Sequence, residues 1–412
     1  MEAQMLQKKT RSKSVIKNAD IIIVSSQPWY TDIGSTCKNV AHEFAKTNRV
    51  LYINSPLDRK TLLKQKNDIN IKRHLEIINT NSKQVFEVEK NIWNYYPARI
   101  LESINWIPFT PIFSVLNRIN NKRFAADIKE AAELMGFKDF ILFNDNDIFR
   151  GFYLKEYLKP KLYIYCNRDN LLGVDYWKKH GVELEAKLIA KSDLTVANAH
   201  TLTEYSLKHN SNSHYFGMGC NIELFNGRKK FAVPADMQNI PHPVIGYVGA
   251  LTSLRINTSI IKAIAMAHPD YSLVMVGPYD TLNDKHEIDN LPNVYFLGKK
   301  PVSALPAYMQ AMDVCLNPQA INDITIVNYP LKIDEYLAMG KPVVATKTRE
   351  MEMFDDCIYL AEEPEEHAAL AEKALTEDNE ILKEQRIALA ESHTWEIAVE
   401  KIYLAINKTL SN

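Results

Sequence analysis

Short apolar runs alternate with amphipathic segments from about residue 20 onward, and this alternation constrains the fold more than any other feature. The first example is a buried-strand pattern at 21–24, followed by a loop and a helical pattern with Val40, Ala41 and Phe44 on one face. A second strand pattern follows at 50–53. Strand, helix and strand in this order form one βαβ crossover, and repeated crossovers build a parallel sheet with helices on its faces. The sequence therefore predicts an α/β fold.

The alternation is interrupted at 227–243, where Gly, Lys, Arg and Pro crowd a stretch without periodicity. Strands are predicted on both sides of it, at 140–143, 162–165, 194–196, 214–216, 244–248, 273–276, 294–297, 314–316 and 343–345. We predict a flexible basic tail at 1–19, Rossmann-like domains at 20–226 and 244–394, the linker between them, and a helix at 395–412 with Thr394 as its N-cap. Doubly wound sheets bind ligands at the carboxyl ends of their strands, so we expect a site between the domains.

Composition excludes several classes of protein. The 412 residues carry 49 Lys and Arg against 50 Asp and Glu, a net charge of −1, so no overall field attracts nucleic acid. The five cysteines and eleven histidines form no metal-binding pattern, and we expect reduced thiols and no metal site. The start of the chain lacks an apolar signal region, and no apolar run approaches the roughly 20 residues of a spanning helix. We expect a cytoplasmic protein, with any membrane contact made peripherally from the inner face.

The segment 328–345, NYPLKIDEYLAMGKPVVA, is the most informative for function. Pro330 suits the first turn of a helix, and Gly340 suits the position after its end. Glu335 shares a helical stripe with apolar neighbours, so its carboxylate needs partners. Ribose hydroxyls suit this carboxylate and a phosphate suits Lys332, but an ordinary surface Lys–Glu pair, worth about 0.2 to 0.5 kcal/mol, is equally compatible.

A second segment, VIGYVGALTSLRIN at 244–257, has the pattern of a phosphate loop. Gly249 ends a predicted strand, Arg255 lies in the turn, and a helix is predicted to start near Asn257. Glycine permits a close backbone approach, the helix start supplies N–H donors, and an arginine can bind a phosphate with two parallel hydrogen bonds. A glycine after the first strand is common in α/β domains, so simple turn chemistry also explains this loop.

These segments resemble the donor domain of GT-B glycosyltransferases, especially the family 4-like retaining enzymes of bacterial surface polysaccharide assembly. The likeness runs through GYVGAL at 246–251, LVMVGP at 273–278, NVYFLG at 293–298, MDVCLNP at 312–318 and the block 332–346. The segment GMGCNIELF at 217–225 is similar to the close of that family's first domain, and SHTW at 392–395 to the start of its crossing helix. The resemblance implies two Rossmann-like, doubly wound domains that face each other across a cleft, with the C-terminal helix crossing back to the first domain.

The resemblance also implies a reaction. A sugar is transferred from a nucleotide sugar to a hydroxyl of a glycan or lipid-linked glycan precursor, with retention of configuration and without metal or another cofactor. Glu335 matches the second Glu of the family's Glu-x7-Glu motif and is implied to hold the ribose. The diphosphate is implied to lie near Gly249, Arg255 and Lys332, and the base beside Gly277, Pro278 and Gly298.

One position departs from the family pattern. The first Glu of the motif is replaced by Val327, and we expect the adjacent Asn328 or the backbone around Tyr329 to contact the donor sugar instead. The departure leaves open a catalytically silent glycan-binding scaffold. A nucleotide-sugar epimerase on the same scaffold is the other alternative.

Polar residues follow three predicted strands of the first domain. Asp145 and Asp147 have the spacing of the metal-binding Asp-x-Asp of GT-A enzymes, but loops favour such residues, and we expect the two on the acceptor side of the cleft. Gly34, in the first βα loop, is expected on the same side, although turn geometry explains it equally. Asp169 is the catalytic candidate, and the alternative is a pair with Arg168 that fixes the loop.

An aromatic, apolar stretch at 93–113 precedes three basic residues, Arg118, Lys122 and Arg123. Packing of a long helix in the core is the favoured interpretation of this stretch. The alternative is a bilayer-facing lip that captures a lipid-linked acceptor, with the basic tail adding attraction to anionic lipid.

Overall fold

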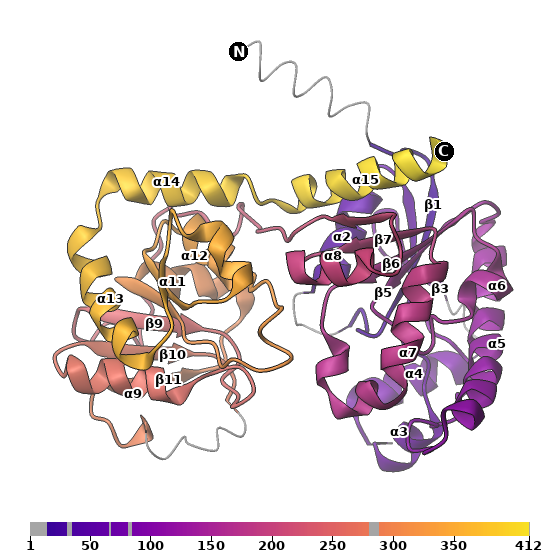
Figure 1. The fold of residues 1–412 in the computed structure, drawn as a ribbon, viewed down its shortest axis with the longest axis horizontal. Coiled ribbons are helices and arrows are strands. Elements are labelled where there is room, and N and C mark those ends of the chain that lie inside the picture. Colours follow the sequence, from indigo (N-terminus) through magenta and orange to yellow (C-terminus); the bar gives the residue numbers. More distant parts are fainter. Residues whose placement is uncertain (1–14, 31–34, 66, 81–84, 280–287, 412) are drawn as a thin grey trace, which may run out of the picture. The chain divides into compact units, whose positions relative to one another are not determined.

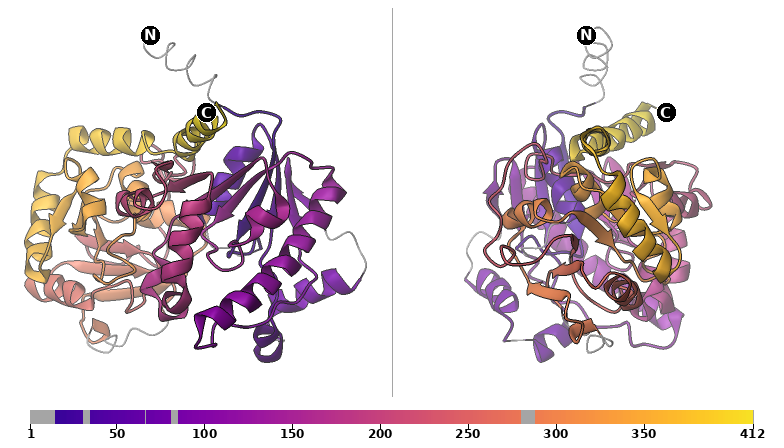
Figure 2. Two further views of the ribbon diagram at one scale, coloured as in Figure 1. Left: turned by 45° about the vertical axis from the view of Figure 1, so that its right-hand side comes forward. Right: turned by 90° about the vertical axis from the view of Figure 1, so that its left-hand side faces the viewer.

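The computed structural model describes residues 15–30, 35–65, 67–80, 85–279 and 288–411 (Figures 1 and 2). The chain divides into two compact units, the first made of residues 1–216 and 398–412 and the second of residues 217–397. Each unit contains one sheet, as the α/β alternation predicts. The predicted end of the first domain, residue 226, lies inside the second unit.

The sheet of the first unit has eight strands in the order β3-β4-β2-β1-β5-β6-β7-β8. All neighbours run parallel except β3 and β4, which pair antiparallel at one edge. The strands are β1 (Asp20–Ser25), β2 (Arg49–Ile53), β3 (Val85–Glu89), β4 (Ile92–Tyr95), β5 (Ile141–Asp145), β6 (Leu162–Asn167), β7 (Leu194–Ala197) and β8 (Ser213–Tyr215). The six strands predicted in this half are confirmed, whereas β3 and β4 were not predicted.

Helices cover both faces of this sheet (Figure 1). They are α2 (Thr36–Ala45), α3 (Arg59–Lys64), α4 (Ile69–Asn79), α5 (Thr110–Met135), α6 (Leu154–Leu158), α7 (Asp175–Lys191) and α8 (His200–Leu207), with a 3₁₀ turn η1 (Leu171–Gly173). On one face, Phe113 and Phe124 of α5 share a buried cluster with Leu188 of α7. On the other, the ring of Phe44 in α2 lies 5.6 Å from that of Phe143 in β5.

The aromatic stretch is divided between core and surface. Tyr95 and Tyr96 are buried at β4, and Phe113 is fully buried beneath α5, so core packing is confirmed for these residues. Trp106 and Phe109, by contrast, are 75% and 64% exposed, and core packing is wrong for them.

The sheet of the second unit has six parallel strands in the order β11-β10-β9-β12-β13-β14. They are β9 (Val244–Val248), β10 (Ser272–Val276), β11 (Val294–Gly298), β12 (Val314–Asn317), β13 (Val343–Thr346) and β14 (Tyr359–Ala361), of which all but β14 were predicted. The helices are α9 (Thr258–Ala267), α11 (Leu305–Gln310), α12 (Lys332–Ala338), α13 (Pro364–Glu377) and α14 (Glu380–Glu391), with 3₁₀ turns η2 (Val302–Ala304) and η3 (Arg349–Phe354). Ile260 and Ile264 of α9 and Ala371 of α13 pack in one cluster on the sheet.

The last helix, α15 (Trp395–Ser411), belongs to both units. The hydroxyl of Thr394 accepts the N–H of Ile397 at 3.3 Å, which confirms the predicted N-cap. Residues from Ala398 onward belong to the first unit, where Tyr403 accepts a hydrogen bond from buried Asn48 at 2.9 Å. Across the described residues, no helix combines the length and apolar character needed to cross a membrane.

Candidate functional site

The loops that follow β9, β10 and β11 are joined by backbone hydrogen bonds, and together they are called the glycine edge, formed by 249–251, 277–278 and Gly298. The N–H of Gly277 donates to the carbonyl oxygen of Gly298 at 3.0 Å. The N–H of Leu251 donates to Pro278 at 2.9 Å, and the N–H of Gly249 donates to the residue before Gly277 at the same distance. The four predicted glycine and proline positions therefore meet at one edge of the sheet.

Two glycines of this edge have no room for a side chain. Gly277 has φ 153°, and a Cβ built there would lie 1.8 Å from the carbonyl oxygen of Gly249. A Cβ at Gly249 would lie 2.5 Å from the Tyr247 hydroxyl and 2.9 Å from Lys332 Nζ. These glycines let the loops and the Lys332 ammonium approach one another closely.

Hydrogen bonds within the protein decide which backbone amides of the loop after β9 are available to a ligand. The N–H groups of Gly249 and Leu251 are already used inside the protein and cannot also contact a diphosphate. The N–H groups of Ala250 and Thr252 have no acceptor within the part of the chain that the structure describes. Gly249 therefore contributes space, and the available amide donors are its neighbours.

Helix α12 carries Lys332 and is fixed beside the end of β9, because the hydroxyl of Tyr336 accepts the N–H of Val248 at 2.8 Å. The Lys332 Nζ donates to the Tyr247 hydroxyl at 2.7 Å and lies 4.3 Å from the centre of that ring. Among the described residues, no carboxylate forms an ion pair with Lys332. This ammonium is therefore available to an anion.

The ends of α12 match the prediction in part. The sequence predicts Pro330 in the first turn of this helix. This prediction is wrong, because the helix starts at Lys332 and Pro330 precedes it. Gly340 has φ 72° and follows the C-cap, where the sequence predicts it. The backbone closes there through the N–H of Lys341, which donates to the carbonyl of Tyr336 at 3.0 Å.

Two consecutive carboxyl groups of α12 have different surroundings. Asp334 is fully buried, accepts a hydrogen bond from the Tyr329 hydroxyl at 2.7 Å and lies 2.9 Å from His393 Nδ1. Glu335 is partly exposed, and its carboxyl makes no hydrogen bond or ion pair with the residues described. The ordinary Lys332–Glu335 surface pair is therefore not formed, and the Glu335 carboxyl is open to a ligand.

Loss of solvent raises the pKa of Glu335 to about 7; the Lys332 ammonium opposes this rise and the Asp334 carboxylate adds to it. The folded chain therefore holds a proton on Glu335 that the unfolded chain releases from pH 4.5 upward. The contribution of Glu335 to the free energy of unfolding is then present at low pH and is lost as the pH rises toward 7.

The same shift predicts a pH dependence of donor binding. Between pH 6 and pH 8 the ionised fraction of Glu335 rises from about a tenth to about nine tenths, and the carboxylate is the form that accepts two hydroxyl hydrogen bonds. We expect the Kd for a nucleotide sugar to fall several-fold over this range in calorimetric titrations. Glu335→Gln should remove the dependence, and an equal slope in both proteins would contradict the assignment.

Two further predicted residues form no hydrogen bond with the glycine edge in the described part of the chain. Arg255 is exposed, its N–H donates to Thr252 and its carbonyl accepts from Ala320, but its side chain forms no hydrogen bond or ion pair with the described residues. Asn328 Oδ1 is buried and has no hydrogen-bond donor among the described residues. Asn317 Nδ2, at the end of β12, is also buried and has no hydrogen-bond acceptor among the described residues. The sequence analysis did not predict this residue, although it ends an apolar run.

In the first unit, Arg168 joins two of the predicted acidic residues. Its Nε lies 2.8 Å from Asp145 Oδ1, and a terminal nitrogen contacts the Asp169 carboxylate. Ser25 donates to the other Asp145 oxygen at 2.8 Å. The structure thus contains the Arg168–Asp169 pair of the alternative interpretation, and a catalytic role for Asp169 stays a prediction.

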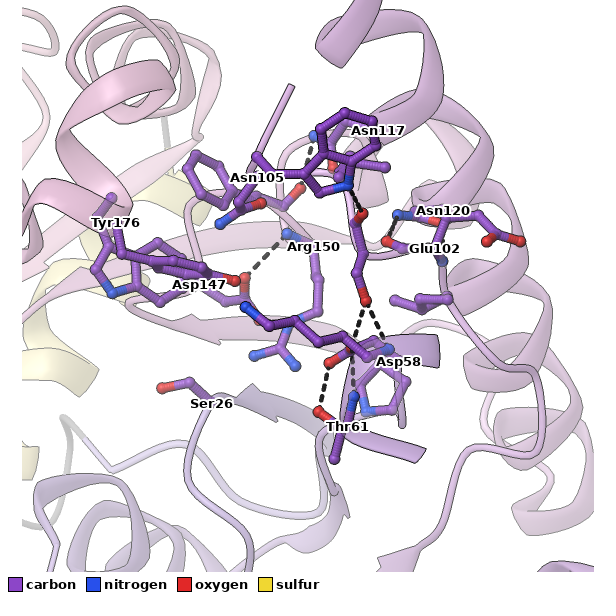
Figure 3. A pocket seen from close by; sticks show the side chains of 18 of the residues that line it. Ser26, Asp58, Thr61, Glu102, Asn105, Asn117, Asn120, Asp147, Arg150 and Tyr176 are labelled. Carbon is purple, nitrogen blue, oxygen red and sulfur yellow. Dashed lines mark hydrogen bonds and ion pairs between the residues drawn. The ribbon is translucent and has the colours of Figure 1, made fainter. Parts of the chain in front are cut away.

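Asp147 has a different partner from Asp145, so the two do not converge as in an Asp-x-Asp site. It is fully buried and accepts hydrogen bonds from the backbone N–H and Nε of Arg150 at 2.9 and 2.6 Å. Asp147 and Arg150, but not Asp145, line a cavity of about 590 Å³ in the first unit, shown in Figure 3. Gly34 lies outside the residues that the structure describes.

Comparison with known proteins classifies the part of the chain that holds the glycine edge. Residues 242–377, from β9 to α13, match the family model of Glycosyl transferases group 1. This stretch is a group 1 glycosyl transferase domain. The chain is also 28% identical over 254 residues to TuaH of Bacillus subtilis (strain 168), which is named for a glycosyltransferase role in teichuronic acid biosynthesis. That match covers 58% of this chain and 64% of the relative, so it spans less than two thirds of that protein.

Solved structures show the fold of the whole chain. Sucrose-phosphate synthase from Thermosynechococcus elongatus has a TM-score of 0.67 at 16% identity, over 96% of this chain and all of that one. Anabaena HepE in complex with UDP-glucose has a TM-score of 0.62 at 16% identity, over 94% of this chain and 99% of that one. The prediction of a GT-B fold with two Rossmann-like sheets is confirmed.

Proposed function

We propose that this chain is a glycosyltransferase that transfers a sugar from a nucleotide sugar to a hydroxyl of a glycan or lipid-linked glycan precursor, with retention of configuration. The observation that carries the proposal is the unpaired Lys332 ammonium beside the open Glu335 carboxyl at the glycine edge. Both lie inside the group 1 glycosyl transferase domain. A similar fold, that of HepE, was solved with UDP-glucose, which supports a nucleotide-sugar donor.

In the proposed reaction, one bond forms and one bond breaks at C1 of the donor sugar. The acceptor oxygen bonds to C1 of the donor sugar, while the bond from C1 to the β-phosphate oxygen breaks and its electron pair leaves with the nucleoside diphosphate. The acceptor proton passes to a phosphate oxygen of the leaving group on the same face. Negative charge grows on the diphosphate, and Lys332 with the N–H groups of Ala250 and Thr252 would stabilise it without a metal.

Glu335 takes a binding role in this proposal. Its carboxylate accepts hydrogen bonds from the two ribose hydroxyls, which places the diphosphate toward the glycine edge. Gly277 and Pro278 would lie beside the base and Gly298 would leave space for it, since a Cβ there meets no atom within 4 Å. Asn328 Oδ1 offers an unused acceptor to a sugar hydroxyl. Arg255 remains a phosphate ligand in the proposal, on the exposed loop that precedes α9.

A donor screen tests the proposal. The full chain is incubated with UDP-, GDP- and ADP-linked sugars, with and without EDTA, and release of the nucleoside diphosphate is measured together with thermal unfolding. We expect slow, EDTA-resistant hydrolysis of one donor class, and stabilisation of about 2.7 kcal/mol at a hundred times the Kd of its nucleotide. Interconversion of two nucleotide sugars without an acceptor would instead indicate the epimerase. Absence of both hydrolysis and stabilisation would indicate the silent scaffold.

The proposal places the enzyme in the cytoplasm, at the inner face of the plasma membrane. Its support is the α5 stripe, a row of exposed apolar side chains at helical spacing formed by Phe109, Ile112, Val115 and Ile119, which are 64, 53, 63 and 44% exposed. Exposed Arg118 and Lys122 flank the stripe. Apolar side chains beside cations suit an anionic bilayer surface, where a lipid-linked acceptor is found.

Vesicle binding tests this surface. We expect the chain to co-sediment with phosphatidylglycerol vesicles, and the double variant Ile112→Ser, Val115→Ser to bind at least about tenfold more weakly, because each side chain loses about 1.5 to 3 kcal/mol of burial. The matched control is Val182→Ser, which removes a 54% exposed valine from α7 in the same unit. Equal binding of all three proteins would refute membrane contact through α5.

A further inference from the structure

The cavity of the first unit is built from polar segments that lie far apart in the chain. Its walls come from α3 and the residue before it, from 101–106, from the inner side of α5, from the loop after β5 and from the start of α7. Figure 3 shows Asp58, Glu102, Asp147, Arg150 and Tyr176 arranged around one open volume of about 590 Å³. Asp147 belongs to the acceptor side predicted from the sequence, but the cavity itself was not predicted.

Arg150 is held rigidly at the wall of this cavity. Fully buried Asp147 accepts hydrogen bonds from both its backbone N–H and its Nε, so one carboxylate holds the guanidinium against its own turn. The turn is tight, because a Cβ at Gly151 would lie 2.5 Å from the Asp147 carbonyl oxygen. The two terminal nitrogens of Arg150 point into the cavity and have no hydrogen-bond acceptor among the described residues (Figure 3). A guanidinium presented in this way matches a planar, two-oxygen anion.

The other charges around the cavity leave positive charge unpaired. Lys60, Lys64 and Lys179 line it, are exposed and form no ion pair within the described part of the chain. By contrast, Glu102 is neutralised by two arginines outside the lining, at 2.6 and 2.9 Å. Two lining carboxylates, Asp58 and the exposed Asp175 at the start of α7, likewise form no ion pair in the same part of the chain, so these three lysines outnumber them by one.

Among the groups that line the cavity, the hydrogen-bond acceptors have partners within the protein more often than the donors do. The Asp58 carboxylate accepts from the backbone N–H and the hydroxyl of Thr61 at 3.1 and 2.8 Å, and from the Ser103 hydroxyl. Asn105 Nδ2 is buried and donates no hydrogen bond to the described residues. The free groups are therefore mainly donors, which suit an oxyanion.

Aromatic rings complete the cavity. Tyr176 and Trp106 line it and are 57% and 75% exposed, and the indole N–H of Trp106 donates to the Ser103 carbonyl at 2.7 Å, which holds that ring in place. A sugar ring has an apolar face and polar hydroxyl groups at its edge. Exposed aromatic rings can pack against the apolar face, and the neighbouring polar donors can bind the hydroxyl groups.

We infer that this cavity binds an acidic sugar, whose carboxylate or phosphate is held by Arg150 with Lys60 and Lys179, and whose ring lies against Tyr176 and Trp106. The inference rests on the proposed glycosyltransferase function, in which the cavity receives the acceptor. It adds the chemical class of that acceptor: a glycan or lipid-linked precursor that carries negative charge on or next to its terminal sugar.

Calorimetric binding to the full chain, without donor, tests the inference. The probes are glucuronate, glucose 1-phosphate and glucose, at low ionic strength. We expect at least one of the two acids to bind about tenfold or more tightly than glucose, because charge-assisted hydrogen bonds are among the strongest polar contacts. The preferred acid distinguishes a carboxylate from a phosphate. Equal affinity for all three probes, or no binding of either acid, would overturn the inference.

Variants locate the binding. Because loss of Arg150 alone would leave the buried Asp147 charge unpaired, the variant is the double change Asp147→Asn, Arg150→Gln, which keeps both shapes without charge. We expect it to reduce acid binding at least about tenfold and Lys179→Ala to reduce it several-fold, with the affinity for glucose little changed. The matched control is Lys178→Ala, an exposed neighbour outside the cavity. Equal loss in the Lys178 and Lys179 variants would assign the effect to general charge and refute the site.

Failure of this inference and failure of the proposed function are separable. If the unaltered chain hydrolyses a nucleotide sugar but binds neither acid, the glycosyltransferase proposal stands and the acidic acceptor is wrong. If it binds an acid through Arg150 but neither hydrolyses nor binds any nucleotide, the cavity is a sugar site in a protein that is not a transferase.

Discussion

Glu335→Ala is expected to lower kcat/KM for the nucleotide sugar by about 100-fold. The Glu335 carboxyl is partly exposed and unpartnered among the described residues. In the proposed function it accepts two hydrogen bonds from ribose, and their loss from a charged group would cost about 1.5 kcal/mol or more each. The measurement is steady-state release of nucleoside diphosphate against donor concentration. The fold should be unaffected at pH 8, because the variant removes a carboxylate whose ionisation the site opposes.

Two further variants keep this test specific. Glu335→Gln preserves the shape and should retain part of the affinity. Glu352→Ala removes an exposed carboxyl elsewhere in the second unit and should behave as the unaltered chain. Unchanged donor kinetics in Glu335→Ala would remove the ribose assignment even if the chain proved to be a transferase.

Gly277→Ala is expected to damage both stability and nucleotide binding. The added Cβ would lie 1.8 Å from the Gly249 carbonyl oxygen, and backbone cannot move aside as a flexible side chain can. Separation of these two loops would also break the hydrogen bonds that join the glycine edge. We expect a loss of about 3 kcal/mol or more in the free energy of unfolding, measured by circular dichroism, and loss of stabilisation by nucleotides.

Gly298→Ala is the matched control for this clash. Its φ of 70° is also unfavourable for alanine, but a Cβ there has no atom within 4 Å. We therefore expect a cost of only about 1 to 2 kcal/mol, from the backbone conformation alone. Equal losses in the two variants would show that contact with Gly249 is not what requires glycine at 277.

The fold was predictable wherever a strand is a buried apolar run. Strands such as β1 and β9 are buried along almost their whole length, and the sequence shows each as a short run of mainly apolar residues. Strand β3 lies at an exposed edge and has the sequence VFEVE. Its two glutamates break the apolar run by which the other strands were predicted. Strand β14 has three residues, too few to form a pattern.

The candidate site was predictable in its residue types and less so in its contacts. Lys332 and Glu335 could be predicted as site residues because they lie in the first turn of a helix whose end is marked by Gly340. The packing of α12 against β9 places Lys332 over Tyr247 and leaves Glu335 unpaired. This packing joins distant segments, so it could not be predicted from the local sequence. The cavity around Arg150 was missed for the same reason, since its walls come from separate segments that only the fold brings together.

Helix α15 has a consequence for synthesis of the chain. Its residues from Ala398 onward complete the unit whose strands are made first, and Tyr403 bonds Asn48 there. Domains generally fold in order as they leave the ribosome. Here the first unit lacks one helix until α15 has been synthesised, after the whole of the second unit. A chain that stops at residue 397 would therefore carry the second unit attached to a first unit without this helix.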